Sequence, residues 1–365
     1  MSSDSPSSAN VMLPVYAGAR RRGQGALLGY HRSMPMNLIV AAIYLYALVV
    51  IVTLVYEERD PSTTLAWILV ILLFPVGGVV LYVLFGRDWR RIGGRDAQLQ
   101  IATEAGRHRM AALYERFPFS ECELASTSLE GHIARCITAQ NRTQPLPCAE
   151  LEVFTSGAEK FERLLTDISH AKRFVHLEYF IWESDALTQR FCDALAEKVA
   201  QGVEVRVLYD FVGSFFHRKT QLRALAKAGA VVRADAANWQ KLNYRNHRKM
   251  AVVDGAIAYT GGMNLGQEYV DGGSRFETWR DTHLRFTGPL VADLHTLFCM
   301  RWYRLVGEDL YDDAHFPEPA NPAHGTWVWA QLSFSGPETP WQAIRQTYLV
   351  AIGAARKRVW LQSPY

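Results

Sequence analysis

Two charge-free runs mark the front of this chain. Residues 38–56 carry no charged side chain, and neither do residues 65–85. Each run is close to the roughly 20 apolar residues that a helix needs to cross a bilayer. A buried core helix would also give such a run, but two of them joined by a short polar segment predict a two-helix transmembrane hairpin. Pro75 and the pair Gly77 and Gly78 predict a kink or a close helix contact in the second run.

The basic residues predict how this hairpin is oriented. Arg32 and the run 20–22 precede the first span, four arginines follow the second within residues 87–95, and the connecting loop is net acidic. Cytoplasmic loops carry the excess of Lys and Arg, so both ends of the hairpin are expected in the cytoplasm. Such flanking arginines also attract anionic lipid. The length of the first run, and the lack of a clear cleavage site after it, disfavour a cleaved signal peptide.

Beyond residue 97 the pattern becomes that of an α/β domain. Amphipathic helices are predicted at 158–170, 188–201 and 219–228, the last of them ended by Gly229. Apolar runs between and after them predict buried strands at 173–179, 203–209 and 230–233. This alternation predicts a sheet that is covered by helices on both faces.

Composition narrows the chemistry. The net charge of +3 is too small to predict a nucleic-acid partner. The 5 cysteines are an odd number without a Cys-x-x-Cys pair, which predicts neither a zinc site nor a disulfide framework. No metal or other cofactor is therefore expected. Residues 1–10 are rich in serine, which predicts disorder.

One stretch carries recognisable chemistry. It places His247, Lys249 and Asp254 in the spacing His-x-Lys-x-x-x-x-Asp, followed after six residues by a Gly-Gly-Met-Asn string that ends at Asn264. An imidazole can attack phosphorus and form a covalent phosphohistidine. An ammonium and a carboxamide can bind the phosphoryl oxygens on which negative charge develops. The stretch therefore points to phosphodiester chemistry that requires no metal.

The spacing also predicts geometry. His247 and Lys249 are two residues apart, so both side chains leave the same face of an extended strand and can grip one phosphate. The apolar run 250–253 that follows is typical of a buried strand. The structural alternative is a core histidine beside a solvated edge lysine.

A hairpin should complete the arrangement. Asp254-Gly255 is a tight-turn signal, and residues 257–260 are expected to form the returning strand. Gly261 and Gly262 would let the backbone approach a phosphate before Asn264 points back into the site. The motif is thus predicted to be a β-hairpin with a polar end.

On these residues the chain resembles the phospholipase D superfamily. The string NYRNHRKMAVVDGAIAYTGGMNLGQEY, followed by WRDTHLRFTGP, is similar to the first catalytic half of bacterial cardiolipin synthases. STTLAWILVILLFPVGGVVLYVLFG is similar to their hydrophobic N-terminal segment. The resemblance implies a phospholipase D-like α-β-α sandwich and a multi-pass protein of the bacterial inner membrane with its catalytic region cytoplasmic. It also implies condensation of two phosphatidylglycerols into cardiolipin and glycerol through a phosphatidyl-enzyme on a motif histidine.

The resemblance assigns roles to individual residues. Asp281 occupies the place of the acidic residue that hydrogen-bonds the catalytic histidine, and a carboxylate there would fix the imidazole tautomer. Asp254 either holds the hairpin together or touches substrate. Lys249 and Asn264 would stabilise the transition state. His247 would be the nucleophile or the acid–base partner, and one half of the site does not decide between them.

Other residues are expected at the border of the site. Gly261 and Gly262 are predicted to bind substrate through their backbone. Glu178 and Asp210 fall at the ends of predicted strands, where they could line the site or serve only the loops.

The chain repeats one of its elements. The segment from Phe154, a Ser-Gly opening, a helix, a basic pair and an apolar strand, is echoed from Phe334 to the last residue, Tyr365. The superfamily uses two histidines across one phosphate, yet no second His-x-Lys-x-x-x-x-Asp occurs in the sequence. We therefore expect a complete first half and only the beginning of a second, as in a truncated synthase. Pairing of two copies, a homo-oligomer, is another way to supply the second histidine.

The expected plan is sequential. A cytoplasmic N-terminal segment (1–36) precedes the transmembrane hairpin (37–86), a helical linker (87–150), the first catalytic half (151–310), and a linker with the start of the second half (311–365). Three alternatives remain: a phospholipase D or nuclease that uses water, a phosphatidylserine synthase that uses serine, and a non-catalytic membrane partner of a full-length synthase.

Overall fold

The computed structural model describes residues 36–56, 61–86, 97–118, 128–235, 247–273, 276–319, 327–336 and 342–362. The chain divides into two compact units, Met1–Val80 and Leu81–Tyr365. The Ser-rich start and the arginines on which the predicted orientation rests lie outside the described residues.

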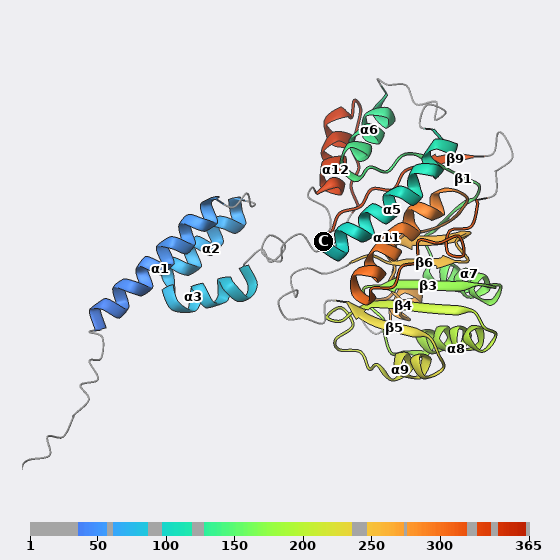
Figure 1. Ribbon diagram of the computed structural model, residues 1–365, viewed down its shortest axis with the longest axis horizontal. Coiled ribbons are helices and arrows are strands. Elements are labelled where there is room, and N and C mark those ends of the chain that lie inside the picture. Colours follow the sequence, from blue (N-terminus) through green and yellow to red (C-terminus); the bar gives the residue numbers. More distant parts are fainter. Residues whose placement is uncertain are drawn as a thin grey trace, which may run out of the picture. The chain divides into compact units, whose positions relative to one another are not determined.

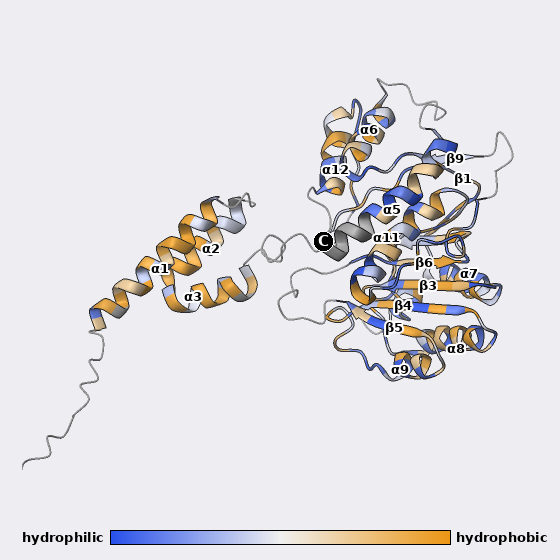
Figure 2. Ribbon diagram, in the orientation of Figure 1, coloured by the Kyte–Doolittle hydropathy of each residue, from blue (hydrophilic) through white to orange (hydrophobic). Residues whose placement is uncertain are grey.

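The first unit is built from apolar helices. Helix α1 (Met36–Tyr56) packs against α2 (Pro61–Leu73), and α3 (Pro75–Leu81) follows. Leu54 and Ile71 are fully buried, whereas most other side chains of α1 are exposed although they are apolar. Figure 2 shows that these helices are coloured mainly as hydrophobic along their length. Among the described residues, α1 is the one helix long and apolar enough to cross a membrane by length and composition.

The second apolar run does not form one continuous spanning helix. The helix is interrupted between Leu73 and Pro75, because proline lacks an N–H group and its ring clashes with the preceding turn. Gly78 then lies against α2, where an added Cβ would stand 2.6 Å from the carbonyl oxygen of Val70. The predicted kink and close helix contact are therefore confirmed, but they fold the run back on itself.

The second unit is organised around a mixed seven-stranded sheet with the order β2-β8-β7-β6-β3-β4-β5. Strands β3, β4 and β5 are parallel, and the other neighbours are antiparallel. The strands are β2 (Leu151–Phe154), β3 (Phe174–Tyr179), β4 (Glu204–Asp210), β5 (Val231–Asp235), β6 (Met250–Val253), β7 (Ile257–Gly261) and β8 (His283–Thr287). A separate pair joins β1 (Leu146–Cys148) to β9 (Val328–Ala330).

Helices cover both faces of this sheet, as predicted (Figure 1). One face packs against α7 (Gly157–Ser169), α8 (Ala186–Ala200) and α9 (Thr220–Lys227), and the other against α11 (Leu290–Val306), which α5 (Ala97–Arg116) covers in turn. The remaining helical elements are η1 (Tyr82–Gly86), α6 (Leu129–Asn141), α10 (Glu268–Asp271) and α12 (Ala343–Ala354). The predicted helices and strands of this region agree with the structure to within about two residues.

Strand β6 shows why the hairpin is apolar throughout. Ala251 and Val253 belong to the core under α7 and α8, whereas Met250 and Val252 belong to the core under α11. Successive side chains of a strand point to opposite faces, so a strand covered on both sides must be apolar at every position.

The repeated element is only partly formed in its second copy. Its helix is present as α12, but residues 359–361 form no strand. Their side chains lie in solvent, and Trp360 is 83% exposed. The strand expected there is therefore not formed, and its apolar side chains are left exposed.

A cluster of buried histidines lies between β3 and α11. Nδ1 of His176 is 2.9 Å from Nε2 of His295, and both rings stack against Phe298. Burial, and then the neighbouring His295, hold the pKa of His176 far below its ordinary value. Burial likewise lowers the pKa of His295 to about 3, with the charge of His315 acting in the same direction. Both imidazoles are therefore neutral in the folded protein.

We predict that this cluster makes the fold sensitive to acid. A group whose pKa is lowered by folding binds more protons when unfolded, so stability falls as pH drops below the unfolded histidine pKa of roughly 6.5. The melting temperature of the whole chain should decrease between pH values of about 7.5 and 5.5. The variant His295→Gln should show a shallower decrease, and an unchanged pH dependence in that variant would contradict this explanation.

Candidate active site

A tight turn closes the motif hairpin. Asp254 and Gly255 have φ angles of 54° and 65°, and the N–H of Ala256 donates to the carbonyl oxygen of Val253 at 3.0 Å. Two consecutive positive φ angles define a type I′ turn, which suits the twist of a two-residue hairpin loop. The Asp-Gly signal therefore predicted this turn correctly.

Asp254 fastens the turn to the central strand. Its carboxylate accepts hydrogen bonds at 2.8, 2.8 and 2.9 Å from the backbone N–H groups of Lys172, Arg173 and Phe174. Asp254 is also separated from Lys249 by the whole of β6, whose four residues rise roughly 3.3 Å each. These contacts favour the alternative in which Asp254 holds the hairpin together, and its catalytic role stays a prediction.

His247 and Lys249 lie together at the opposite end of β6. Phe180 joins them, because its ring centroid is 4.6 Å from the His247 ring and 5.3 Å from Nζ of Lys249. Nζ also donates to the carbonyl oxygen of His247 at 2.7 Å. Lys249 is buried, whereas His247 is exposed. The imidazole is thus accessible to a ligand, with the ammonium directly behind it.

Burial and charge tune both groups. Partial burial, and then the charge of Lys249, lower the pKa of His247, while Asp281 opposes the change. Burial lowers the pKa of Lys249 to about 8, and the charges of Asp281 and Asp210 limit the decrease. Near pH 7 the imidazole is therefore mainly neutral and able to act as a nucleophile, and the amine is mainly charged.

Asp281 lies close to this pair, but its contacts differ from the expected ones. Its carboxylate stands over Gly262, where an added Cβ would be 2.1 Å from Oδ1. It accepts the N–H of Thr282 at 2.7 Å and acts on His247 through its charge. Position 262 must be glycine because the carboxylate of Asp281 occupies the space of a side chain. The sequence had suggested that this space admits a phosphate. The expected hydrogen bond from His247 to Asp281 is not formed among the described residues.

Asn264 and Gly261 also serve the protein itself. The carboxamide of Asn264 is buried, accepts the N–H of Ile181 at 3.0 Å and donates to the hydroxyl of Tyr269 at 2.5 Å. Gly261 lies against His283, whose Cα would be 2.5 Å from an added Cβ. Asn264 therefore holds the segment that follows β3, and its predicted contact with a phosphoryl oxygen stays a prediction.

The two acidic strand-end residues differ. Asp210 accepts the N–H groups of Val212 and Gly213 and contributes charge near Lys249, so it borders the site. Side chains alternate along β3, so Glu178 points to the same face of the sheet as Phe174, which faces α11. Ala251 and Val253 of β6 point to the opposite face, toward α7 and α8. This alternation argues against the predicted substrate contact of Glu178.

Sequence reasoning missed two buried bases beneath the hairpin. His283, two residues after Asp281 in the string WRDTH, is fully buried, and neither ring nitrogen has a hydrogen-bond partner among the described residues. Lys160 of α7 is fully buried as well, and its Nζ donates to the hydroxyl of Tyr179 at 3.1 Å. Burial holds the pKa of both groups far below their ordinary values. A lysine on the apolar face of a predicted helix was the available signal.

Comparisons with known proteins agree with this hairpin. The family model described as "Cardiolipin synthase, PLD-like domain" matches residues 164–278, and the model "Phospholipase_D-nuclease N-terminal" matches residues 42–87. Over 344 residues the chain is 36% identical to a cardiolipin synthase of Listeria welshimeri, covering 90% of this chain and 69% of that protein. The chain belongs to the cardiolipin synthase family.

The chain is also similar to a second cardiolipin synthase and, more weakly, to a solved structure. The major cardiolipin synthase of Bacillus subtilis is 34% identical over 329 residues, which cover 87% of this chain and 67% of that protein. Among solved structures, a phospholipase D family member, Nuc from Salmonella typhimurium, matches 43% of this chain and 97% of its own at 19% identity and a TM-score of 0.33. Cardiolipin synthases are phosphatidyltransferases of the phospholipase D superfamily, so the resemblance found in the sequence is confirmed.

We predict that Asp254→Ala destabilises the protein without a direct effect on chemistry. It removes three hydrogen bonds to a charged acceptor and places alanine at a positive φ, with a cost of roughly 2–4 kcal/mol. Thermal unfolding in detergent measures the loss, and Asp271→Ala, at an exposed carboxylate elsewhere, is the control. If Asp254→Ala instead kept its melting temperature and lost all activity, Asp254 would belong to the reaction.

Proposed function

We propose that this chain transfers a phosphatidyl group from one phosphatidylglycerol to another, which yields cardiolipin and glycerol. The observation that carries the proposal is the pairing of His247 and Lys249 on one hairpin, within a chain of the cardiolipin synthase family. An exposed neutral imidazole beside a partly buried ammonium is suited to attack on a phosphodiester.

In the first step Nε2 or Nδ1 of His247 forms a bond to phosphorus, and the bond from phosphorus to the glycerol oxygen breaks. The leaving glycerol oxygen takes a proton from a general acid. Lys249 supports the charge that develops on the phosphoryl oxygens. Burial holds the pKa values of Lys160 and His283 far below their ordinary values, and an anion nearby would raise both and strengthen the positive potential.

In the second step a hydroxyl of another phosphatidylglycerol attacks the phosphohistidine. The bond between phosphorus and His247 breaks as the new bond forms. The proton of the attacking hydroxyl passes to the group that served as general acid in the first step and lost its proton there. The acid–base group is a second histidine across the phosphate. Two copies of the chain, with their hairpins facing one another, would supply it, so we propose a homo-oligomer as one active form.

The membrane is the place where this substrate occurs. We propose that α1 spans the inner membrane of a bacterium and that the broken run of α2, α3 and η1 returns through it, which leaves the catalytic region in the cytoplasm. The length and apolar surface of α1 support this arrangement. So does the match of residues 42–87 to a family N-terminal model.

A product assay tests the reaction. The whole chain, reconstituted at high concentration in vesicles that contain phosphatidylglycerol alone, should form cardiolipin and release an equal amount of glycerol. His247→Ala should lower the rate by a factor on the order of 1000 or more, because the nucleophile is lost. Formation of phosphatidic acid without cardiolipin would indicate a hydrolase, and product that appears only after serine is added would indicate a serine transferase.

The pH profile should be bell-shaped. The reaction needs His247 neutral, the acid–base histidine protonated and Lys249 charged. The value of kcat/KM should therefore rise with pH through a His247 pKa below roughly 6.5, and fall as the acid–base histidine and then, at about 8, Lys249 lose their protons. Lys249→Arg should retain less activity and lose the part of the alkaline limb near pH 8, because a guanidinium stays charged. An alkaline limb that is unchanged in this variant would show that Lys249 is not the group that titrates.

An aromatic loop beside the site supports action at a membrane surface. Phe216 is 92% exposed and Phe215 57%, although aromatic rings are usually buried. The loop is fixed to the site, because the hydroxyl of Ser214 donates to the carbonyl oxygen of Phe180 at 3.2 Å. Arg218, also exposed, adds charge that suits anionic lipid.

We predict that Phe216→Ala selectively impairs action on bilayers. Its rate on phosphatidylglycerol vesicles should fall several-fold, since the ring no longer enters the lipid interface, while its rate on dispersed short-chain phosphatidylglycerol should stay unchanged. Trp360→Ala, which removes another exposed aromatic ring, is the matched control. Equal losses on both substrates would assign Phe216 to the active site instead of the membrane contact.

A further inference from the structure

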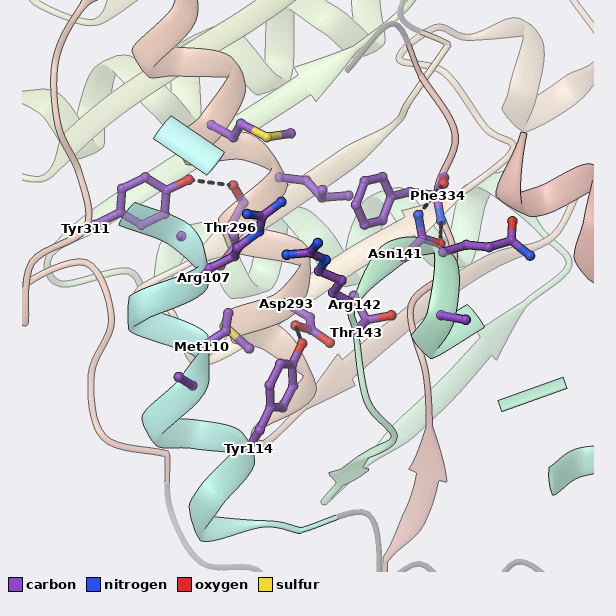
Figure 3. A pocket seen from close by; sticks show the side chains of 16 residues that line it. Arg107, Met110, Tyr114, Asn141, Arg142, Thr143, Asp293, Thr296, Tyr311 and Phe334 are labelled. Atoms are coloured by element: carbon purple, nitrogen blue, oxygen red, sulfur yellow. Dashed lines mark hydrogen bonds between the residues drawn. The ribbon is translucent and has the colours of Figure 1, made fainter. Parts of the chain in front are cut away.

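A second recess lies on the other side of the sheet from α7 and α8. It is a cavity of about 400 Å³ between α5, the end of α6 and α11, a volume in the range of small-molecule sites. Figure 3 shows its lining side chains, and His247 and Lys249 are not among them. Apolar side chains, among them Met110, Leu297 and Met300, form much of its wall.

Its floor holds a polar pair. The hydroxyl of Tyr114 donates to Oδ1 of Asp293 at 2.6 Å, as Figure 3 shows. Asp293 is 3% exposed, and its Oδ2 has no hydrogen-bond partner among the described residues. Burial raises the pKa of Asp293 to about 7, so near neutrality this carboxyl can both donate and accept. A buried polar atom without a partner is rare in proteins, and a ligand hydroxyl would satisfy it.

The rim carries positive charge. Arg107 and Arg142 both line the cavity and are exposed to solvent. Within the described residues the guanidinium of Arg142 makes no hydrogen bond or ion pair. That of Arg107 contacts Glu104 at 2.9 Å, a surface ion pair that contributes little and can be exchanged. Guanidinium groups bind phosphate oxygens through two parallel hydrogen bonds, and two of them on one rim disfavour a cationic ligand.

We propose that this cavity is a second, non-catalytic binding site for a phosphoglycerol group, with the phosphate between Arg107 and Arg142 and the glycerol hydroxyls on Asp293 and Tyr114. The ligand is either the headgroup of an anionic glycerophospholipid or a free glycerol phosphate, which share this chemistry. The proposal concerns binding alone and therefore goes beyond the reaction proposed for His247.

A contact joins this site to the catalytic hairpin. Phe334 lines the cavity, and the guanidinium of Arg248 lies 5.8 Å from the centroid of its ring. Arg248 also donates to the carbonyl oxygen of Ser335 at 3.5 Å. Because Arg248 stands between His247 and Lys249 in the motif, a ligand that contacts Phe334 is one side chain away from the reacting pair.

Binding can be measured without turnover. The whole chain carrying His247→Ala, in nanodiscs of phosphatidylcholine, is titrated with sn-glycerol 3-phosphate and, separately, with inorganic phosphate, by isothermal calorimetry and ³¹P NMR. A parallel series uses nanodiscs that contain phosphatidylglycerol and follows protection of the α5–α11 region from hydrogen exchange. Saturable binding of glycerol 3-phosphate identifies a free metabolite as a ligand, and protection only by phosphatidylglycerol identifies the lipid headgroup.

Matched variants locate the site. Arg142→Gln should weaken binding at least about tenfold, because a charge-assisted pair is lost. Arg223→Gln on α9, which removes the same charge from the other face of the sheet, should leave it unchanged. Ala111→Trp should abolish binding by filling the cavity while the melting temperature is retained.

Several results would overturn the proposal. The first is the absence of both saturable glycerol 3-phosphate binding and protection by phosphatidylglycerol. The second is equal affinity for inorganic phosphate and glycerol 3-phosphate. The third is equal weakening of binding by Arg142→Gln and Arg223→Gln. Every readout is a binding measurement on a variant without the nucleophile. Failure of this binding proposal would therefore not bear on the proposed reaction. Loss of cardiolipin formation would likewise leave this site untouched.

Discussion

The attachment of the Asp254 carboxylate to the backbone amides at and just before the start of β3 fixes the rest of the active region. It pins the turn of the hairpin at one end of the central strand. From that point β6 runs beside β3 with a register that places Val253 opposite Val175 and Met250 opposite Glu178. The residues that precede β6 therefore lie at the far end of the sheet, where His247 and Lys249 contact Phe180. A residue far from the phosphate thus sets where the phosphate can bind.

The chemistry depends on basic side chains that are held out of water. Lys249 is buried against Phe180, and Lys160 and His283 lie deeper, under the same hairpin. Burial disfavours the charged forms of such groups unless an anion compensates them, so this arrangement favours a phosphoryl group. Asp281 and Asp210 keep this cost tolerable by maintaining the charge of Lys249. The exposed imidazole remains neutral and available to attack.

The sequence predicted local features well because they depend on local chemistry. Asp254-Gly255 gave the turn, apolar runs gave the strands, and the spacing of His247 and Lys249 gave their shared end of the hairpin. It failed where the partner of a residue comes from elsewhere in the chain. Nothing near Asn264 in the sequence reveals that the N–H of Ile181 donates to its side-chain oxygen. Nothing near Gly262 reveals that the carboxylate of Asp281 lies against it. Pro75 in the sequence predicted the break in the helix. The contact of Gly78 with Val70 is a tertiary contact, which the sequence did not specify.

The most direct measurement of the central claim is the identification of the covalent intermediate. The whole chain is mixed with phosphatidylglycerol, denatured rapidly at alkaline pH, where phosphohistidine persists, and digested for mass spectrometry. Our account predicts a phosphatidyl group on the peptide that contains His247, and its loss in His247→Ala. An adduct on another residue, or one that persists in His247→Ala, would show that this imidazole is not the nucleophile.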